Sequence, residues 1–255
     1  MISEYLEAFI LSIVQGVSEF IPVSSSAHLL IISRLSDFSV SNLQLDISLH
    51  LGSLLAIILF FRKELINIIN NKNIFLLIII GSIPLVIIGY IFYSTNLIDQ
   101  FRNLKVVAWT TLIFGVLLYF SDKFELKNKI SSELNIKSII IIGLFQILAI
   151  IPGVSRSGIV ITASRFLKFD RVESSKIAFY LSIPALAGAS FLGIKDVMEN
   201  SIDFNLIFIF STLSSFFISF LTIKYFLIYV KNFDLKFFVY YRVFLSLILF
   251  VIVYS

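Results

Sequence analysis

Two interrupted apolar segments of this chain carry the side chains that could do chemistry. Glu19 lies in the first segment, just before the stretch Pro22–His28, which reads PVSSSAH. Arg156 lies in the second segment, inside the stretch Pro152–Gly158, which reads PGVSRSG. An ionisable residue within an apolar segment is costly to insert into a membrane and usually faces a partner or a polar path. Glu19 and Arg156 are therefore the first candidates for a functional site.

The side chains around these two residues are suited to phosphate. Gln15 is four residues before Glu19, so the two project from one face of a helix. The guanidinium of Arg156 is planar and forked, which suits bidentate phosphate binding, and helix N-termini also favour anions. A carboxylate beside an anion site makes sense if a divalent cation bridges them or if the carboxylate handles protons. Hydroxyls and an imidazole complete the set: Ser24, Ser25, Ser26, His28, Ser155 and Ser157.

Plainer interpretations compete with this one. In the first, Glu19 and Arg156 form a buried salt bridge whose role is purely structural and which holds the two segments together. Buried salt bridges contribute little net stability, which counts against this interpretation. A serine alone is more typical of a helix cap than of a nucleophile, and spacing does not show which serine would react. His28 alone fits an interior histidine, and its place beside the serines favours function. Gln15 stays open between a ligand and a structural hydrogen bonder.

Composition places these side chains in a membrane. Hydrophobic residues make up 58% of the 255 residues and charged residues 14%, against roughly 45–50% and about 25% in a soluble domain. So much apolar surface needs lipid to cover it, which excludes an ordinary cytosolic enzyme, a disordered chain and a nucleic-acid-binding tail. The chain has no Cys, so thiolate metal sites and a Cys nucleophile are excluded as well.

Six largely unbroken apolar runs are predicted to span the membrane. Several are shorter than the roughly 20 residues of an ideal span, so their ends are defined only to within several residues. The predicted spans are Ser48–Phe61, Ile74–Tyr93, Val106–Phe120, Ile177–Ile194, Phe204–Leu221 and Phe238–Val253.

The two interrupted segments are predicted to be re-entrant helical hairpins. They run over Leu6–Arg34 and Ser138–Lys168, and in each a Pro and a Ser or Gly cluster break the helix. Freed backbone groups cannot face hydrocarbon, so each break must be surrounded by protein or by a water-filled cavity. Gln15 and the serines after Pro22 parallel Gln146 and the serines after Pro152, so the segments resemble each other.

The resulting fold class is an all-α polytopic membrane protein with an inverted-topology repeat. The chain is one integral membrane domain over residues 1–255, in which repeat 1 covers about 1–121 and repeat 2 about 137–255. Each half has one re-entrant hairpin and three transmembrane helices, and an odd number of crossings gives the halves opposite orientations, with the two polar turns meeting near the midplane. The loops 62–73, 121–137, 164–176 and 223–237 then share one side and hold 14 basic residues against 4 on the other. This bias predicts that the first side is cytoplasmic and that both termini face outward.

At these residues the chain resembles the undecaprenyl-diphosphate phosphatase family, the bacitracin-resistance type of membrane phosphatase, over nearly its whole length. The first family motif stands here as Gln15–His28, QGVSEFIPVSSSAH, and the second as Pro152–Gly158, PGVSRSG. Both motifs are long and specific. The family pattern allows Glu or Gln at the position of Gln15, so a mechanism that needs two carboxylates there is not favoured.

The resemblance implies hydrolysis of undecaprenyl diphosphate to undecaprenyl phosphate and inorganic phosphate. The reaction would take place at the extracytoplasmic face of the bacterial cytoplasmic (inner) membrane and would recycle the lipid carrier for peptidoglycan and other cell-wall polymers. It would confer bacitracin resistance. The implied partners are the polyprenyl diphosphate substrate and the lipid bilayer, and no nucleic acid is expected. The resemblance leaves open whether the chain forms a homodimer.

The resemblance also implies roles for individual residues. Glu19, with Gln15 as a second candidate, would hold a divalent cation, Mg or Ca, or move a proton, and Arg156 would clamp the diphosphate. Either Ser25 or His28 would be the nucleophile or the base, and the resemblance does not decide between them. Four hydroxyls would hydrogen-bond phosphate oxygens: those of Ser24, Ser26, Ser155 and Ser157.

Two other interpretations compete with this one. A secondary transporter or flippase for an anionic lipid or solute also fits, because inverted repeats and broken helices are typical of transporters. The acid-phosphatase-like lipid phosphatases need a histidine beyond their arginine, whereas the two histidines here, His28 and His50, both precede Arg156. That class is excluded.

Overall fold

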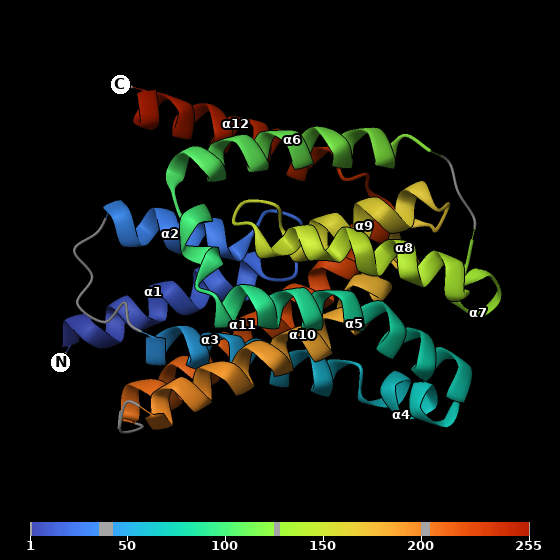
Figure 1. Ribbon diagram of the computed structural model, residues 1–255, viewed down its shortest axis with the longest axis horizontal. Helices are drawn as coiled ribbons and strands as arrows, with labels where there is room; N and C mark the ends of the chain where they lie inside the picture. The colour runs from blue at the N-terminus through green and yellow to red at the C-terminus, as the bar shows by residue number, and fades with distance from the viewer. Residues whose placement is uncertain (1, 36–42, 125–127, 200–204, 255) are drawn as a thin grey trace.

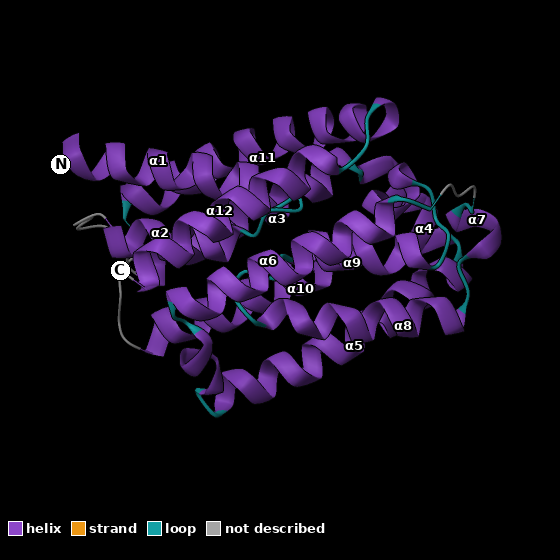
Figure 2. Ribbon diagram, turned by 90° about the horizontal axis from the view of Figure 1, so that it is seen from above, coloured by secondary structure: helices purple, strands orange, loops and turns teal. Residues whose placement is uncertain are grey.

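The computed structural model describes residues 2–35, 43–124, 128–199 and 205–254. Over these residues the chain is helical, with one isolated β-bridge between Asn128 and Phe169 and no strand (Figure 2). The α-helices in chain order are α1 (Ile2–Ser18), α2 (Ser25–Leu35), α3 (Leu43–Phe60), α4 (Arg62–Asn70), α5 (Lys72–Ser94), α6 (Leu104–Asp122), α7 (Ile130–Glu133), α8 (Ile136–Ile147), α9 (Arg156–Phe166), α10 (Arg171–Glu199), α11 (Leu206–Asn232) and α12 (Lys236–Tyr254). Two 3₁₀-helices accompany them, η1 (Leu97–Phe101) and η2 (Leu148–Ile150).

The predicted all-α polytopic membrane fold is confirmed. Five helices of the described chain are long and apolar enough to cross a membrane, namely α5, α6, α10, α11 and α12. A sixth span results if α3 and α4, which meet at a bend of 72°, are counted together. These six spans contain the six runs predicted from sequence except at two described residues, Phe61 at the bend between α3 and α4 and Asn205, which caps α11. Phe204, the first residue of the fifth run, lies outside the described residues.

The loops are shorter than the sequence analysis predicted, and this part of the prediction is wrong. Most of 62–73 is helix α4, and α11 continues to Asn232, so most of 223–237 is helical as well. Between α9 and α10 only residues 167–170 remain of the predicted loop 164–176. Lysine and arginine are good helix formers, so a helix continues past the residue at which its apolar character ends. Capping side chains mark the ends instead, as Asn205 does where it accepts a hydrogen bond from Phe208 N at the start of α11.

Both interrupted segments form helical hairpins. The first consists of α1 and α2, and the second of α8 and α9, and in each pair the two helices contact each other (Figure 1). The helices α2, α8 and α9 have 11, 12 and 11 residues. At about 1.5 Å per residue each reaches roughly half of a hydrocarbon core that is about 30 Å thick. The turns between the paired helices lie inside the bundle, since Ser24 and Ser155 are 3% and 5% exposed.

Long helices surround the two hairpins. Helix α11 packs along α3 and α1, α12 along α6, and α10 against α3 and α9, while α5 packs on α8. Small residues allow the closest of these contacts: a Cβ at Gly143 of α8 would lie 3.2 Å from the Cα of Gly81 in α5. Both chain termini lie at one end of the bundle, and α4 and α7 lie at the other (Figures 1 and 2).

Candidate active site

The turns of the two hairpins have the same local geometry. Ser24 and Ser155 each precede the first residue of a short helix, and each has a left-handed backbone, with φ of 78° and 70°. In each turn the serine lies 3.2 Å from a second hydroxyl two residues later, Ser26 in the first and Ser157 in the second. A left-handed conformation at a residue other than glycine is strained and persists only where its surroundings enforce it. The similarity between the two sequence motifs therefore has a counterpart in the backbone.

Glu19 is the centre at which the two hairpins meet. Its Oε1 accepts a hydrogen bond from Arg156 Nη2 at 2.6 Å, which joins the first turn to the second. Its Oε2 accepts from Ser25 Oγ at 2.5 Å and from Gln15 Nε2 at 3.0 Å. The Glu19 side chain is 6% exposed, so these charge-assisted hydrogen bonds are sheltered from water. The structure thus brings four of the residues singled out from sequence into direct contact.

Two polar atoms beside this cluster are buried without a hydrogen-bond partner among the described residues. One is Gln15 Oε1, an acceptor, and the other is Arg156 Nη1, a donor. An unsatisfied buried polar atom is costly, and a bound ligand or ion is one way in which it can be satisfied. An amide oxygen suits a cation and a guanidinium N–H suits an anion, so the two orphaned atoms fit a site for a phosphate together with a cation.

The remaining predicted residues lie around this cluster. Ser157 Oγ donates to Ile21 O at 2.9 Å and so ties the second turn to the first. Ser155 Oγ caps α9 by accepting from Gly158 N at 3.1 Å, and Ser26 is exposed. His28 makes no hydrogen bond to Glu19; its Nδ1 lies 2.6 Å from Ser24 O.

Tyr241 holds the other nitrogen of His28, and sequence reasoning missed this partner. The Tyr241 hydroxyl lies 2.5 Å from His28 Nε2, and the two rings are stacked with centroids 5.7 Å apart. Nothing in the sequence distinguished Tyr241 from the other nine tyrosines, most of which suit an interfacial belt.

Arg242 is the second residue that the sequence reasoning missed. It is fully buried, and its guanidinium donates to four backbone carbonyls. The acceptors are Pro22 O in the first turn at 3.2 Å, Gly153 O and Val154 O in the second at 2.8 and 3.1 Å, and Thr111 O of α6 at 3.2 Å. The signal was present, because Arg242 is an ionisable residue within a predicted span. The run around Arg242 is otherwise unbroken, so no helix break marks this residue as part of a site.

Helix α6 supports the second turn from the other side. Thr110 Oγ1 donates to Pro152 O at 2.6 Å. Gly153 has φ of +91°, and a Cβ at this position would lie 2.9 Å from Val107 O. Only glycine fits here, because a side chain would meet both the backbone conformation and the close approach of α6.

The donor set limits how a metal could be bound. The described residues contain no group of three or more His, Cys, Asp or Glu side chains that could hold an ion. Glu19 is the one carboxylate at the turns, and the free oxygen nearby is Gln15 Oε1. Mg²⁺ is commonly held by one or two carboxylates together with substrate phosphates and water. The residues present fit that kind of site and do not fit a closed protein cage.

Comparisons with known proteins agree on one family. The family described as "Bacitracin resistance protein BacA" matches residues 8–248. An undecaprenyl-diphosphatase of Pelagibacter ubique (strain HTCC1062) is 54% identical, with all of both chains covered. An undecaprenyl-diphosphatase of Elusimicrobium minutum (strain Pei191) is 40% identical with 96% of each chain covered, and undecaprenyl-diphosphatase 4 of Bacillus thuringiensis (strain Al Hakam) is 37% identical with 98% covered.

The first prediction concerns Arg242. The variant Arg242→Lys keeps the positive charge, but one ammonium group cannot reach four carbonyls that converge on a planar guanidinium. We expect the free energy of unfolding to fall by about 1–3 kcal/mol, because three ammonium donors leave at least one of the four buried carbonyls without a donor. Thermal unfolding of the purified protein in detergent measures this. The control is Arg62→Lys, at an exposed position of α4, and equal unfolding midpoints for the two variants would contradict the role of Arg242.

Proposed function

The chain belongs to the bacitracin resistance protein BacA family, and we propose that it hydrolyses undecaprenyl diphosphate to undecaprenyl phosphate and inorganic phosphate. The reaction recycles the lipid carrier for cell-wall polymers and accounts for bacitracin resistance. The observation that carries the proposal is the contact of Glu19 with both Ser25 and Arg156, in a chain related over its full length to undecaprenyl-diphosphatases. A transporter is not favoured, because the relatives are named for cleavage of a diphosphate.

We propose Ser25 as the nucleophile and Glu19 as its general base. Ser25 Oγ already donates a hydrogen bond to Glu19 Oε2, at 2.5 Å. In the first step this proton moves to Glu19, a bond forms between Ser25 Oγ and the terminal phosphorus, and undecaprenyl phosphate leaves with the bridging oxygen. Glu19 passes this proton to the undecaprenyl phosphate that leaves. In the second step Glu19 takes a proton from the attacking water, the bond between phosphorus and Ser25 Oγ breaks, Glu19 returns the proton to Ser25 Oγ, and inorganic phosphate leaves. His28 makes no hydrogen bond to Glu19, so this geometry supports Ser25 over His28 as the reacting group.

The two turns supply the positive potential that a diphosphate needs. Phosphoryl transfer depends mainly on positioning and on neutralising charge. Arg156 Nη1 is a buried donor left over for a phosphate oxygen. Helices α2 and α9 begin at the turns, so the positive ends of their dipoles favour an anion there. The four other serine hydroxyls at the turns are the proposed hydrogen-bonding partners of the phosphates: Ser24, Ser26, Ser155 and Ser157.

A divalent cation, Mg or Ca, is the proposed cofactor. Glu19 and the oxygen of Gln15 would hold it, since Gln15 Oε1 is buried and has no other partner among the described residues. The cation would neutralise part of the charge on the diphosphate. Arg156 would then bind the phosphates beside it.

The proposed location is the bacterial cytoplasmic membrane, with both termini and the opening of the site on the extracytoplasmic side. Two observations support this orientation. Both termini lie at one end of the bundle, and the opposite end, with α4 and α7, belongs to the side that holds 14 of the basic residues (Figure 1).

The matched turns at Ser24 and Ser155 support the proposed inverted repeat, in which each half has one hairpin and three spans.

Phosphate release from a polyprenyl diphosphate by the purified protein tests the function. Glu19→Gln removes the base, and Ser25→Ala removes the nucleophile. We expect each to lower kcat by a factor of about 10² to 10⁴, and His28→Ala to lower it less. The matched control is Glu64→Gln, which removes an exposed carboxylate of α4 and should keep full activity. Normal phosphate release by Glu19→Gln would contradict the proposal, as would transport of the lipid without bond cleavage.

Metal dependence is a separate prediction. Treatment with a chelator should abolish phosphate release, and added Mg²⁺ or Ca²⁺ should restore it. Gln15→Glu should lower the metal concentration needed for half-maximal activity, because a carboxylate binds a hard cation more strongly than an amide oxygen does. Full activity in excess chelator would rule out the cation, and an unchanged metal requirement in Gln15→Glu would remove Gln15 from its site.

The contact between Tyr241 and His28 predicts a smaller effect. Tyr241→Phe removes one hydrogen bond and keeps the stacked ring, so we expect a fall in kcat of about 2- to 12-fold with little change in the unfolding midpoint. Tyr240→Phe is the matched control, because Tyr240 is 64% exposed. If both variants keep full activity, the position of His28 does not matter for the reaction.

A further inference from the structure

A cavity of about 840 Å³ lies away from the two turns, where α6, α9 and α11 end and α10 and α12 begin. Five cationic and three acidic residues line it. The cationic residues are Lys123, Arg165, Arg171, Lys231 and Lys236, and the acidic residues are Asp122, Asp170 and Asp234. The cavity therefore has a surplus of positive charge.

The floor of the cavity is a closed network around Asp122. Its Oδ1 lies 2.7 Å from Arg171 Nε and 3.3 Å from Arg165 Nε. Its Oδ2 accepts from Arg171 Nη2 at 3.1 Å and from the backbone N–H of Leu235 at 2.8 Å. Asp122 is only 8% exposed, so this network joins the ends of α6, α9, α10 and α12 and has no capacity for a further cation.

At the rim of the cavity, two lysine ammonium groups have no carboxylate partner among the described residues. Asp234 Oδ2 pairs with Lys236 Nζ at 2.8 Å, and Asp170 Oδ1 accepts from Glu173 N at 2.8 Å at the start of α10. Within the described part of the chain, Lys123 and Lys231 have no ion-pair partner, and Lys123 Nζ lies 4.4 Å from the centre of the Tyr119 ring. These two lysines are the groups that remain for an anion.

The surroundings of the cavity favour a lipid as the source of that anion. Phe124 lines the cavity and is 51% exposed. Phe233 precedes Asp234 in the chain and is 60% exposed, and Phe237 follows Lys236 and is 64% exposed. Exposed aromatic rings beside basic side chains are typical of the membrane interface. The basic end of a membrane protein also faces the leaflet rich in anionic lipids. We propose that this cavity binds the phosphate headgroup of an anionic phospholipid between Lys123 and Lys231.

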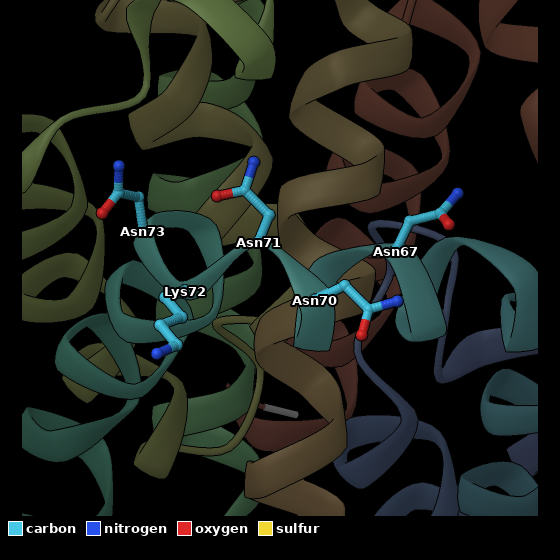
Figure 3. Close-up of a pocket in the computed structure, with 5 residues that line it drawn as sticks. All are labelled: Asn67, Asn70, Asn71, Lys72 and Asn73. Carbon is cyan, nitrogen blue, oxygen red and sulfur yellow. The ribbon is translucent and has the colours of Figure 1, made fainter.

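A second polar pocket lacks the features that the proposed lipid site has. The bend between α4 and α5 forms a polar pocket of about 530 Å³, lined by Asn67, Asn70, Asn71, Lys72 and Asn73 (Figure 3). The ends of these side chains point in different directions and do not converge on one place (Figure 3). It has one cation and no aromatic rim, so it lacks both features on which the proposal rests.

The test is lipid binding by the full-length protein in a neutral detergent. The protein is titrated with dioleoyl phosphatidylglycerol and with dioleoyl phosphatidylcholine, and bound lipid is counted by native mass spectrometry. We expect one phosphatidylglycerol to bind more tightly than phosphatidylcholine. Each lysine near an anionic lipid contributes about a factor of five, so Lys123→Gln combined with Lys231→Gln should weaken phosphatidylglycerol binding about 25-fold.

The control combines Lys72→Gln with Lys137→Gln, which removes two exposed lysines outside the cavity and should bind like the wild type. Equal binding by the Lys123/Lys231 variant and the wild type would overturn the proposal, as would equal weakening by the control. Inorganic phosphate is titrated in parallel, and displacement of the lipid by millimolar phosphate would show a free-phosphate site instead. Phosphate release from a polyprenyl diphosphate should be unchanged in the Lys123/Lys231 variant, which separates this proposal from the proposed reaction.

Discussion

The structure depends on how the backbone groups freed at two broken helices are satisfied inside an apolar bundle. Lipid offers no hydrogen bonds, so each freed carbonyl needs a protein donor. Arg242 provides donors for three of these carbonyls, at Pro22, Gly153 and Val154, and it binds Thr111 O of α6 at the same time. A buried guanidinium is tolerated only when it is fully hydrogen-bonded, so the turns and Arg242 need each other. This shared bonding fixes the distance between the two turns.

The fixed distance between the turns makes the contact of Glu19 with Arg156 possible. The two residues are on different hairpins and are 137 positions apart, yet Nη2 and Oε1 lie within 2.6 Å. The left-handed backbone at Ser24 and Ser155 sets the direction in which each short helix leaves its turn. That strain costs free energy, on the order of 1–3 kcal/mol at each residue, and the surrounding packing must offset it. Strain of this kind is typical of sites that hold reacting groups in place.

Much of this arrangement could be predicted from sequence, because a charge inside an apolar run is a strong signal. That signal identified Glu19 and Arg156, and the Pro and Ser clusters located both hairpins. Helix ends were less predictable, since hydropathy reports where lipid contact ends and α11 continues beyond that point. Contacts between helices were not predictable. No spacing in one sequence shows that Tyr241, 213 positions from His28, would stack on its ring.

The two hairpins share a frame and differ in their chemistry. Gln15 and Ser24 are nine residues apart, as are Gln146 and Ser155, so the position that matches Glu19 is Ile150 and the position that matches His28 is Ile159. Where the first turn has Ser25, the second has Arg156. The first hairpin therefore carries the carboxylate and the second the guanidinium, and neither holds both. A repeated frame with opposite charges can form one ion-paired site where its copies meet, whereas two identical copies would bring like charges together.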